Sequence, residues 1–258
     1  MTRPVALITG ASMGIGADMA REFARRGHDL VLVARSEQKL DALAAELKSL
    51  GANSTVIALD LARPGAAQQL YDAVRAKSVV VESLANNAGF GLKGRFVELS
   101  MQEQSEIVQL NIVTLTELCW LFGRDMAARG FGRILNVASV AAFQSGPEFS
   151  VYAATKGYVL ILSESLDAEL RSRGVNVTVV CPGVVSTNFH ARAKNDSKLL
   201  LSTAMGSQPV AAAAVRALMD RKPVVIPGLI NFLAILTVRF LPRRLVTAVS
   251  YLLVGRSR

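Results

Sequence analysis

The sequence predicts an α/β protein, a doubly wound open parallel sheet in a single domain. Short apolar runs rich in β-branched residues alternate with longer helical segments along most of the chain. Helices between successive strands imply parallel pairing with right-handed crossovers, which covers both faces of the sheet. The 258 residues, 51% hydrophobic and 19% charged, suffice for one sizeable core, and no repeat or linker divides them.

The predicted elements follow one another in alternation. Strands are expected at residues 5–9, 28–34, 54–59, 132–139 and 175–181. A further strand leads to Asn86 and carries Glu82 and Ser83 where apolar side chains are expected. Helices are expected at residues 17–27, 36–50, 64–77, 100–128 and 151–173. In a sheet of this kind ligands bind beyond the carboxyl ends of the strands, so functional residues are sought there.

A glycine turn follows the first strand directly. Gly10, Gly14 and Gly16 permit tight backbone geometry between the strand and the next helix. A pyrophosphate can approach such a turn and bind the amides and the positive dipole end of the helix. Three residues separate the first two glycines, in place of the one residue of the usual G-x-G-x-x-G fingerprint. The turn therefore predicts dinucleotide binding, although any strand-to-helix turn can use glycine.

Tyr152 and Lys156 lie four residues apart in a predicted helix and therefore share a face. An ammonium beside a phenol stabilises the phenolate and lowers its pKa from about 10 toward the range of a general acid or base. Ser139, at the end of an apolar run, can hold a substrate oxygen beside this pair. The spacing alone is a weak signal, because solvated helices also carry Tyr and Lys on one face.

Together these motifs resemble those of the short-chain dehydrogenase/reductase family in its single-domain form. The resemblance covers about residues 4–226 and includes T-G-x-x-x-G-x-G at 9–16, N-N-A-G at 86–89 and P-G at 182–183. The family's active-site set is matched by Asn111, Ser139, Tyr152 and Lys156. The resemblance implies a Rossmann fold and hydride transfer between a nicotinamide and a substrate carbon, with proton transfer through Tyr152.

The same resemblance assigns further roles. Lys156 is expected to hold the nicotinamide ribose as well as to perturb Tyr152, and Asn111 to anchor a water relay. No metal site is expected. Cofactor contacts are expected from Gly10, Ser12, Met13, Gly14, Ile15, Gly16, Arg35, Ser36, Asp60, Leu61, Asn87, Ala88, Gly89, Asn111, Tyr152, Lys156, Pro182, Gly183, Val185 and Thr187.

Charge at the end of the second strand favours NADP(H). An acidic residue there would accept the ribose hydroxyls of NAD, whereas an arginine accommodates a 2′-phosphate. Here Arg35 and Ser36 follow the strand, and the arginine fork can meet a phosphate. Alternatively, Arg35 stacks on the adenine and leaves specificity loose. Asp60 and Leu61 resemble the position that brackets the adenine, or Asp60 is a helix N-cap.

The C-terminal segment, residues 227–258, is predicted as an apolar, basic helical extension of a catalytic domain at 1–226, with a substrate lid at about 184–208. Its apolar runs are shorter than the roughly 20 residues that cross a bilayer. It could lie in the headgroup region of a membrane, cap the substrate pocket or form a subunit interface. Seven basic residues and no acidic one occur from 221 to the C-terminus: Arg221, Lys222, Arg239, Arg243, Arg244, Arg256 and Arg258.

These observations predict an NADP(H)-dependent oxidoreductase that interconverts a carbonyl and an alcohol on an apolar, lipid-like substrate. The alternatives are a 3-oxoacyl reductase of lipid synthesis and, in another class, a non-catalytic NADP-binding or membrane-scaffolding protein. Substrate contacts are expected from residues 90–92, 143–149 and the lid. A homodimer or homotetramer is expected, because the helices at 100–128 and 151–173 resemble the family's dimer-forming pair. Nucleic acid is not an expected partner, since the basic residues are interleaved with aliphatic ones.

The expected location is cytoplasmic, with attachment to the inner face of a membrane as the alternative. The N-terminus enters the first strand without a charged and apolar leader. Cys119 and Cys181 are widely separated and are expected to be buried packing residues, so nothing indicates an oxidising compartment.

Overall fold

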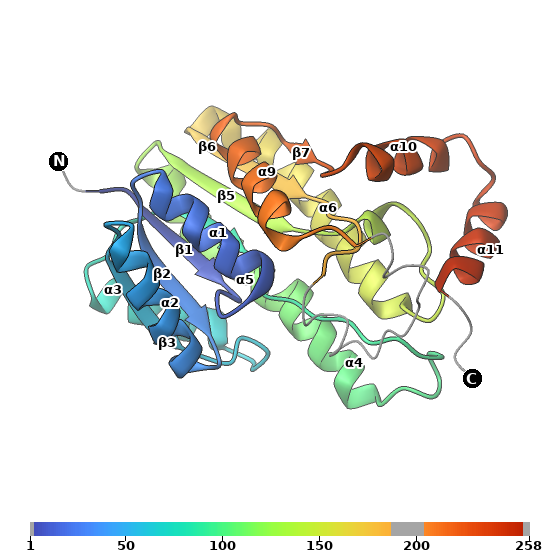
Figure 1. Cartoon of the computed structure of the whole chain (residues 1–258), viewed down its shortest axis with the longest axis horizontal. Helices are drawn as coiled ribbons and strands as arrows, with labels where there is room; N and C mark the ends of the chain where they lie inside the picture. Colours follow the sequence, from blue (N-terminus) through green and yellow to red (C-terminus); the bar gives the residue numbers. More distant parts are fainter. Residues whose placement is uncertain (1–2, 187–203, 255–258) are drawn as a thin grey trace.

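A seven-stranded parallel sheet forms the centre of the protein (Figure 1). The structure is a computed structural model, and it describes residues 3–186 and 204–254. The strand order of the sheet is β3-β2-β1-β4-β5-β6-β7. The order reverses between β1 and β4, and a crevice for ligands is expected at the carboxyl ends on either side of that point. The strands are Val5–Thr9 (β1), Asp29–Ala34 (β2), Ser54–Ala58 (β3), Val81–Asn86 (β4), Gly132–Val137 (β5), Val175–Val180 (β6) and Val224–Val225 (β7).

Helices cover both faces of the sheet, which confirms the predicted doubly wound α/β fold. α1, α2 and α9 pack on one face, with α1 and α9 side by side in Figure 1, and α3, α5 and α6 pack on the other. The main helices are Gly14–Arg25 (α1), Glu37–Ser49 (α2), Ala66–Ala76 (α3), Met101–Val108 (α4), Leu115–Ala128 (α5), Ser150–Leu170 (α6), Ser207–Met219 (α9), Leu229–Val238 (α10) and Arg243–Val254 (α11).

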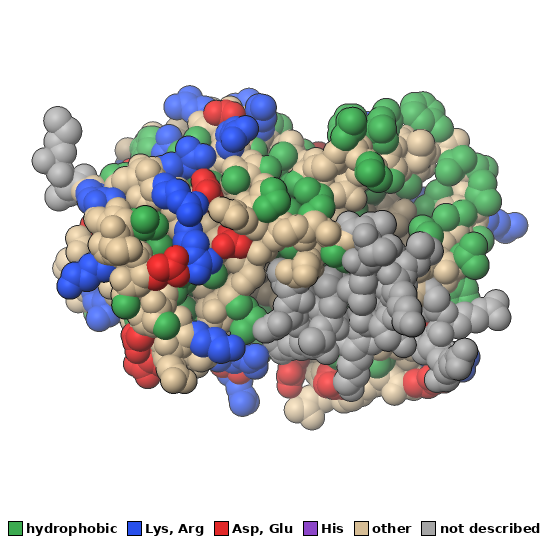
Figure 2. Space-filling view, viewed as in Figure 1, with side chains coloured by type: hydrophobic (Ala, Val, Ile, Leu, Met, Phe, Trp, Pro, Cys, Tyr) green, Lys and Arg blue, Asp and Glu red, His purple; other side chains and the backbone are tan. Residues whose placement is uncertain are grey.

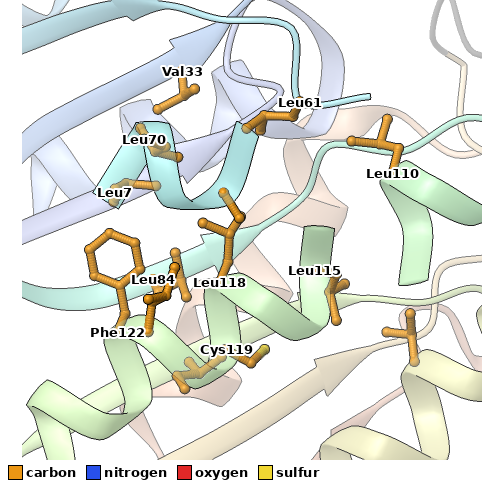
Figure 3. Packing of buried hydrophobic residues seen from close by; sticks show 14 of the residues in the cluster. Leu7, Val33, Leu61, Leu70, Leu84, Leu110, Leu115, Leu118, Cys119 and Phe122 are labelled. Atoms are coloured by element: carbon orange, nitrogen blue, oxygen red, sulfur yellow. The ribbon is translucent and has the colours of Figure 1, made fainter. Parts of the chain in front are cut away.

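Each face of the sheet has its own apolar core, because successive side chains of a strand point to opposite faces. Leu7 of β1 packs with Leu70 of α3 and Phe122 of α5 on one side (Figure 3). Its neighbour Ile8 packs with Phe23 of α1 on the other side. All but Phe122 are fully buried. Burial of each side chain of this size stabilises the fold by about 1.5–3 kcal/mol.

Two irregularities interrupt the regular elements. The helix predicted at 100–128 contains a π-helical turn, Gln109–Thr114, which separates α4 from α5 and includes Asn111. In β4 the register shifts, since Val5 pairs with Val81 and the next residue pairs with Ser83, so Glu82 is an extra residue in the strand. This bulge explains why a charged residue occurs in a strand of the central sheet.

The C-terminal segment leaves the sheet after β7 and forms α10 and α11, which extend beyond the carboxyl ends of the strands (Figure 1). Among the helices within residues 3–186 and 204–254, none is both long enough and apolar enough to span a membrane.

Candidate active site

A cavity of about 660 Å³ opens at the carboxyl ends of the strands. It runs from the glycine turn between β1 and α1 past the ends of β2, β4 and β5 to the start of α6. Most of the predicted site residues line it, which brings together positions that are far apart in sequence. These are Gly10, Ser12, Met13, Gly14, Ile15, Arg35, Ser36, Asp60, Leu61, Asn87, Ala88, Gly89, Ser139, Tyr152, Lys156, Pro182, Gly183 and Val185.

Three of the predicted residues are not part of this lining. Gly16 and Asn111 lie behind the wall of the cavity, and Thr187 lies outside the described residues. The predicted lid at 184–208 falls largely within the same undescribed stretch. Its two described flanks are joined, because Val185 forms a parallel bridge with Met205 and the Ser186 amide donates to the Met205 carbonyl at 2.8 Å.

The glycine turn is held against the end of β4 by Asn87. Its side-chain nitrogen donates to the carbonyls of Thr9 at 2.9 Å and Gly10 at 3.2 Å. A Cβ at Gly16 would overlap the Gly10 carbonyl and lie 2.5 Å from the Asn87 amide, so this position requires glycine. Gly10 has a φ of +67°, a conformation that side chains disfavour. Gly16 therefore permits the tight turn because it has no side chain, although it does not line the cavity.

The start of α1 faces the cavity. Its N-cap is Met13, whose side chain has no oxygen to accept from the first helix amides. Those amides, together with the positive end of the helix dipole, suit an anionic ligand such as a pyrophosphate.

Asn111 supports the site from the π-helical turn. It is 1% exposed, and its side-chain oxygen accepts from the Phe90 amide at 3.2 Å while its nitrogen donates to the Phe90 carbonyl at 3.0 Å. The same nitrogen donates to the Thr155 hydroxyl at 3.0 Å. Asn111 therefore fixes the segment after β4 to the turn of α6 that carries Lys156.

Tyr152 lies on the first turn of α6 with its ring packed on Gly91, where a Cβ would come within 2.7 Å of the ring. Its hydroxyl is hydrogen-bonded to the Ser139 side chain, and that serine also accepts from the Ala141 amide at 3.2 Å. Burial raises the pKa of Tyr152 to about 12, although the Ser139 hydrogen bond acts in the opposite direction. The expected lowering of this pKa by Lys156 is not present in this state.

Lys156 is buried and donates from its ammonium to the Val137 carbonyl at 2.7 Å. The ammonium lies 5.7 Å from the centre of the Tyr152 ring. Burial lowers the pKa of Lys156 to about 8, because a charged ammonium loses its hydration there. A Cβ at Gly89 would lie 3.3 Å from the ammonium, so the Gly89 position leaves room for it.

At the other end of the cavity the lining is basic. Arg35 and Ser36 follow β2, and Lys39 lies in the first turn of α2. Asp60 accepts from the Ala62 amide at 3.1 Å, which is a turn-forming role beside its place in the cavity wall. Within the described residues, no three His, Cys, Asp or Glu side chains gather as metal ligands would.

The family model described as short chain dehydrogenase matches residues 4–198. The chain belongs to this family. It is 37% identical to a short-chain dehydrogenase from Sphingobium yanoikuyae solved in complex with NADPH, with a TM-score of 0.83 and 92% and 94% of the two chains covered. The order of its motifs and the position of each at the carboxyl end of the sheet agree with that membership.

The present chain is also similar to two curated relatives. "Ketoacyl reductase HetN" of Nostoc sp. is 32% identical over 88% of this chain and 79% of its own length. "Probable oxidoreductase EphD" of Mycobacterium tuberculosis is 31% identical over 84% of this chain. The match spans only 40% of EphD, so this chain corresponds to less than half of that relative.

Sequence reasoning did not name every residue that lines the cavity, and Lys39 and the residues from α11 are the informative omissions. Lys39 could have been found, since it lies three residues after Ser36 on the predicted helix and so shares its face. Ser250, Leu253 and Val254 of α11 could not be named individually, because a helix so far from Tyr152 in the chain reaches the cavity only through the tertiary fold. Capping of the pocket by this extension was only one of three predicted alternatives. The presence of these α11 residues means that the C-terminal extension forms part of the pocket wall.

Two contacts hold this extension of the short-chain dehydrogenase in place. The hydroxyls of Ser145 and Thr247 lie 2.5 Å apart and join the loop before α6 to α11. Asn231 of α10 packs on Gly183, where a Cβ would lie 2.5 Å from the Asn231 amide. The P-G motif is thus covered by α10, a contact that the motif itself does not indicate.

Proposed function

We propose that this short-chain dehydrogenase is an NADP(H)-dependent oxidoreductase that interconverts a carbonyl and an alcohol on an apolar substrate. One observation carries the proposal. Ser139, Tyr152 and Lys156 share the wall of a single cavity with the glycine turn and the basic end of that cavity. A proton-transfer group and a dinucleotide cradle in one cavity suit hydride transfer coupled to proton transfer.

The residues present fit a dinucleotide. Because Gly10 and Gly16 have no side chains, the tight turn exposes its backbone where a pyrophosphate must approach closely. The amides at the start of α1 can then donate to the pyrophosphate. Lys156 lines the far wall and would hold the nicotinamide ribose. When bound, the nicotinamide supplies or accepts the hydride at the substrate carbon.

Tyr152 serves as the general acid of reduction. Its raised pKa, about 12, keeps the phenol protonated at neutral pH, and Ser139 orients it by a hydrogen bond. As the substrate carbon is reduced, the tyrosine O–H bond breaks and the proton passes to the substrate oxygen, which becomes the alcohol hydroxyl. The Lys156 ammonium stabilises the phenolate that remains until solvent returns the proton. In oxidation the same atoms move in reverse.

We assign the preference for NADP(H) to Arg35, Ser36 and Lys39. Two cationic side chains and a hydroxyl line the end of the cavity beside β2, a combination that suits a phosphate. The complex of the Sphingobium relative with NADPH supports the same choice. Asp60 also lines this region, but its carboxylate is engaged with the Ala62 amide.

The substrate end of the cavity is apolar. Phe149, whose ring centre lies 6.1 Å from that of Tyr152, lines it together with Val140 and Val184. The wall from α11 adds Leu253 and Val254, and the polar side chains there include Gln144, Ser145 and Ser250. A bulky hydrophobic carbonyl compound buries favourable area against the apolar side chains, whereas a sugar finds few partners for its hydroxyls.

A panel of carbonyl compounds tests the proposal, with oxidation of NADPH or NADH as the readout. We expect kcat/KM to rise with apolar chain length and to be higher with NADPH. Equal activity toward sugars and long-chain ketones would contradict the substrate class. The panel includes a 3-oxoacyl thioester, because similarity to a ketoacyl reductase favours 3-oxoacyl reduction as the second candidate. No turnover of any compound with NADPH bound would favour the non-catalytic scaffold.

We further propose that the chain forms at least a dimer through α5 and α6. Trp120 and Ile161 on these helices are 62% and 66% exposed in the single chain. Large apolar groups at such exposure suit a subunit interface. Light scattering that gave the mass of one chain at micromolar concentration would exclude this assembly.

A further inference from the structure

An apolar surface covers the C-terminal helices of this protein. Ile230 of α10, Phe240 between the helices and Leu252 of α11 are 83%, 81% and 80% exposed. Figure 2 shows side chains of this kind gathered over both helices. We call this the α10–α11 surface; its other exposed apolar members are Leu229, Phe232, Leu233, Leu236, Leu241, Leu245 and Val249. An apolar area of this extent is rare on a protein that faces only water.

Positive charge borders the same surface. Arg239, Arg243 and Arg244 are exposed within it, and no acidic residue follows Asp220 in the sequence. Arg243 and Arg244 are the first two residues of α11, where the helix dipole disfavours cations. These arginines therefore do not stabilise the helix that carries them, and their position suits an anionic partner.

α11 lies between this surface and the cavity. Its inner residues Ser250 and Val254 line the cavity, while Leu245 and Leu252 are exposed. Leu253 belongs to both regions, because it lines the cavity and is 39% exposed. One helix thus connects the apolar outer surface with the rim of the pocket.

We propose that the α10–α11 surface docks onto the headgroup region of an anionic lipid bilayer, with the rim of the cavity at the membrane. Helices of 10 and 12 residues cannot cross a bilayer, but they can lie in its interface with aliphatic side chains inserted and arginines at the lipid phosphates. An apolar carbonyl substrate then reaches the cavity from the lipid, a consequence that rests on the proposed function.

Charge disfavours a second copy of the chain as the occupant. A twofold contact through this surface would bring the arginines of both copies together. Residues 221–258 contain no Asp or Glu side chain to pair with them, and like charges brought together destabilise an interface. A bilayer that contains anionic lipid supplies the missing negative charge.

Co-sedimentation of the full chain with vesicles tests the docking. The two probes are phosphatidylcholine vesicles and phosphatidylcholine vesicles that contain phosphatidylglycerol. We expect binding to the anionic vesicles, weakened by salt, and little binding to the neutral ones. Replacing Arg239, Arg243 and Arg244 by Gln is expected to weaken binding about a hundredfold. Ile230→Glu combined with Phe240→Glu is expected to abolish it.

Val80→Glu is the matched control. Val80 is 60% exposed and precedes β4 at the opposite end of the sheet from the cavity, so this variant is expected to bind as the wild type does. All variants are assayed without vesicles on a water-soluble ketone, where we expect turnover within about twofold of the wild type. If the wild type turns over the ketone but binds no vesicles, the docking fails and the proposed function stands; if it turns over no ketone, the proposed function fails.

Equal binding to both kinds of vesicle, or binding unchanged in Ile230→Glu/Phe240→Glu, would overturn the proposal. Light scattering of the same variants identifies the competing occupant. If they lose an oligomer that the wild type forms and the wild type binds no vesicles, the α10–α11 surface is a contact between copies of the chain.

Discussion

The Lys156 ammonium lies 5.7 Å from the centre of the Tyr152 ring and donates to the Val137 carbonyl at 2.7 Å. Burial removes water from both side chains, which raises the pKa of Tyr152 and lowers the pKa of Lys156. Both shifts favour the neutral form of the group. The protein therefore presents a protonated phenol beside an easily deprotonated amine. This state suits reduction of a carbonyl, in which Tyr152 gives up a proton.

The buried lysine predicts a specific pH dependence of stability. The pKa of Lys156 falls from 10.5 to about 8 on folding, so between these values the unfolded chain binds more protons. The free energy of unfolding of the wild type should therefore rise with pH across that window, relative to Lys156→Met, by up to about 3 kcal/mol. Urea unfolding at several pH values measures it. Lys39→Met, which removes an exposed lysine, is the control. The prediction is refuted if the difference in free energy of unfolding between the wild type and Lys156→Met does not change with pH.

Loss of Asn111 should destabilise the protein. Asn111→Leu leaves the buried amide and carbonyl of Phe90 without their side-chain partner. Each buried group that loses a hydrogen bond costs about 1–3 kcal/mol, so we expect a loss of about 2–5 kcal/mol in urea unfolding. Thr155→Val removes only one hydrogen bond of the same asparagine and should cost about 1 kcal/mol. Equal losses for the two variants would show that the contact with Phe90 is unimportant.

The basic end of the cavity should decide between cofactors. Arg35→Ala and Lys39→Ala remove the two cations that line it, and each is expected to raise the KM for NADPH about tenfold to a hundredfold. The KM for NADH should change little, since NADH carries no 2′-phosphate. Arg25→Ala, on an exposed arginine that pairs with Glu22 and does not line the cavity, is the control. A parallel rise for both cofactors would mean that these residues bind the adenosine and not the phosphate.

The contact between Gly183 and Asn231 should couple α10 to the site. Gly183→Ala places a Cβ 2.5 Å from the Asn231 amide, so the helix or the P-G segment must shift. We expect KM for the cofactor to rise several-fold, and Asn231→Ala in the same chain to restore it in part. Gly157→Ala serves as control, because its Cβ would meet only the Ala142 carbonyl at 3.6 Å. Additive effects of the two changes would argue against this coupling.

The sheet, its parallel order and the gathering of the motifs at one edge could be predicted because they follow from local patterns. A strand such as Val5–Thr9 is readable from five consecutive apolar or β-branched residues. Glu82 was noted as unusual in the fourth strand, but the bulge that accommodates it was not predicted. The π-helical turn around Asn111 was not predicted, because the apolar pattern of residues 100–128 is that of a continuous helix. The partners of Asn111, Phe90 and Thr155, belong to other parts of the chain.

The pKa of Tyr152 was expected in the wrong direction for a related reason. The i to i+4 spacing places Lys156 on the correct face, but it does not reveal that the ammonium turns to the Val137 carbonyl. Nor does spacing measure how completely both groups are withdrawn from water. Capping of the pocket by the C-terminal extension was one of three predicted alternatives. The sequence could not choose among them, because the contact of α11 with the loop at Ser145 spans 102 residues.

The most direct measurement is the turnover of Tyr152→Phe with NADPH and the best carbonyl compound of the panel, alongside calorimetric titration with NADPH. The variant keeps the ring against Gly91 and removes only the hydroxyl. We predict that kcat falls about a hundredfold to ten-thousandfold while the Kd for NADPH stays within about twofold. A variant that turns over at the rate of the wild type would contradict the role of Tyr152 on which the proposed chemistry depends.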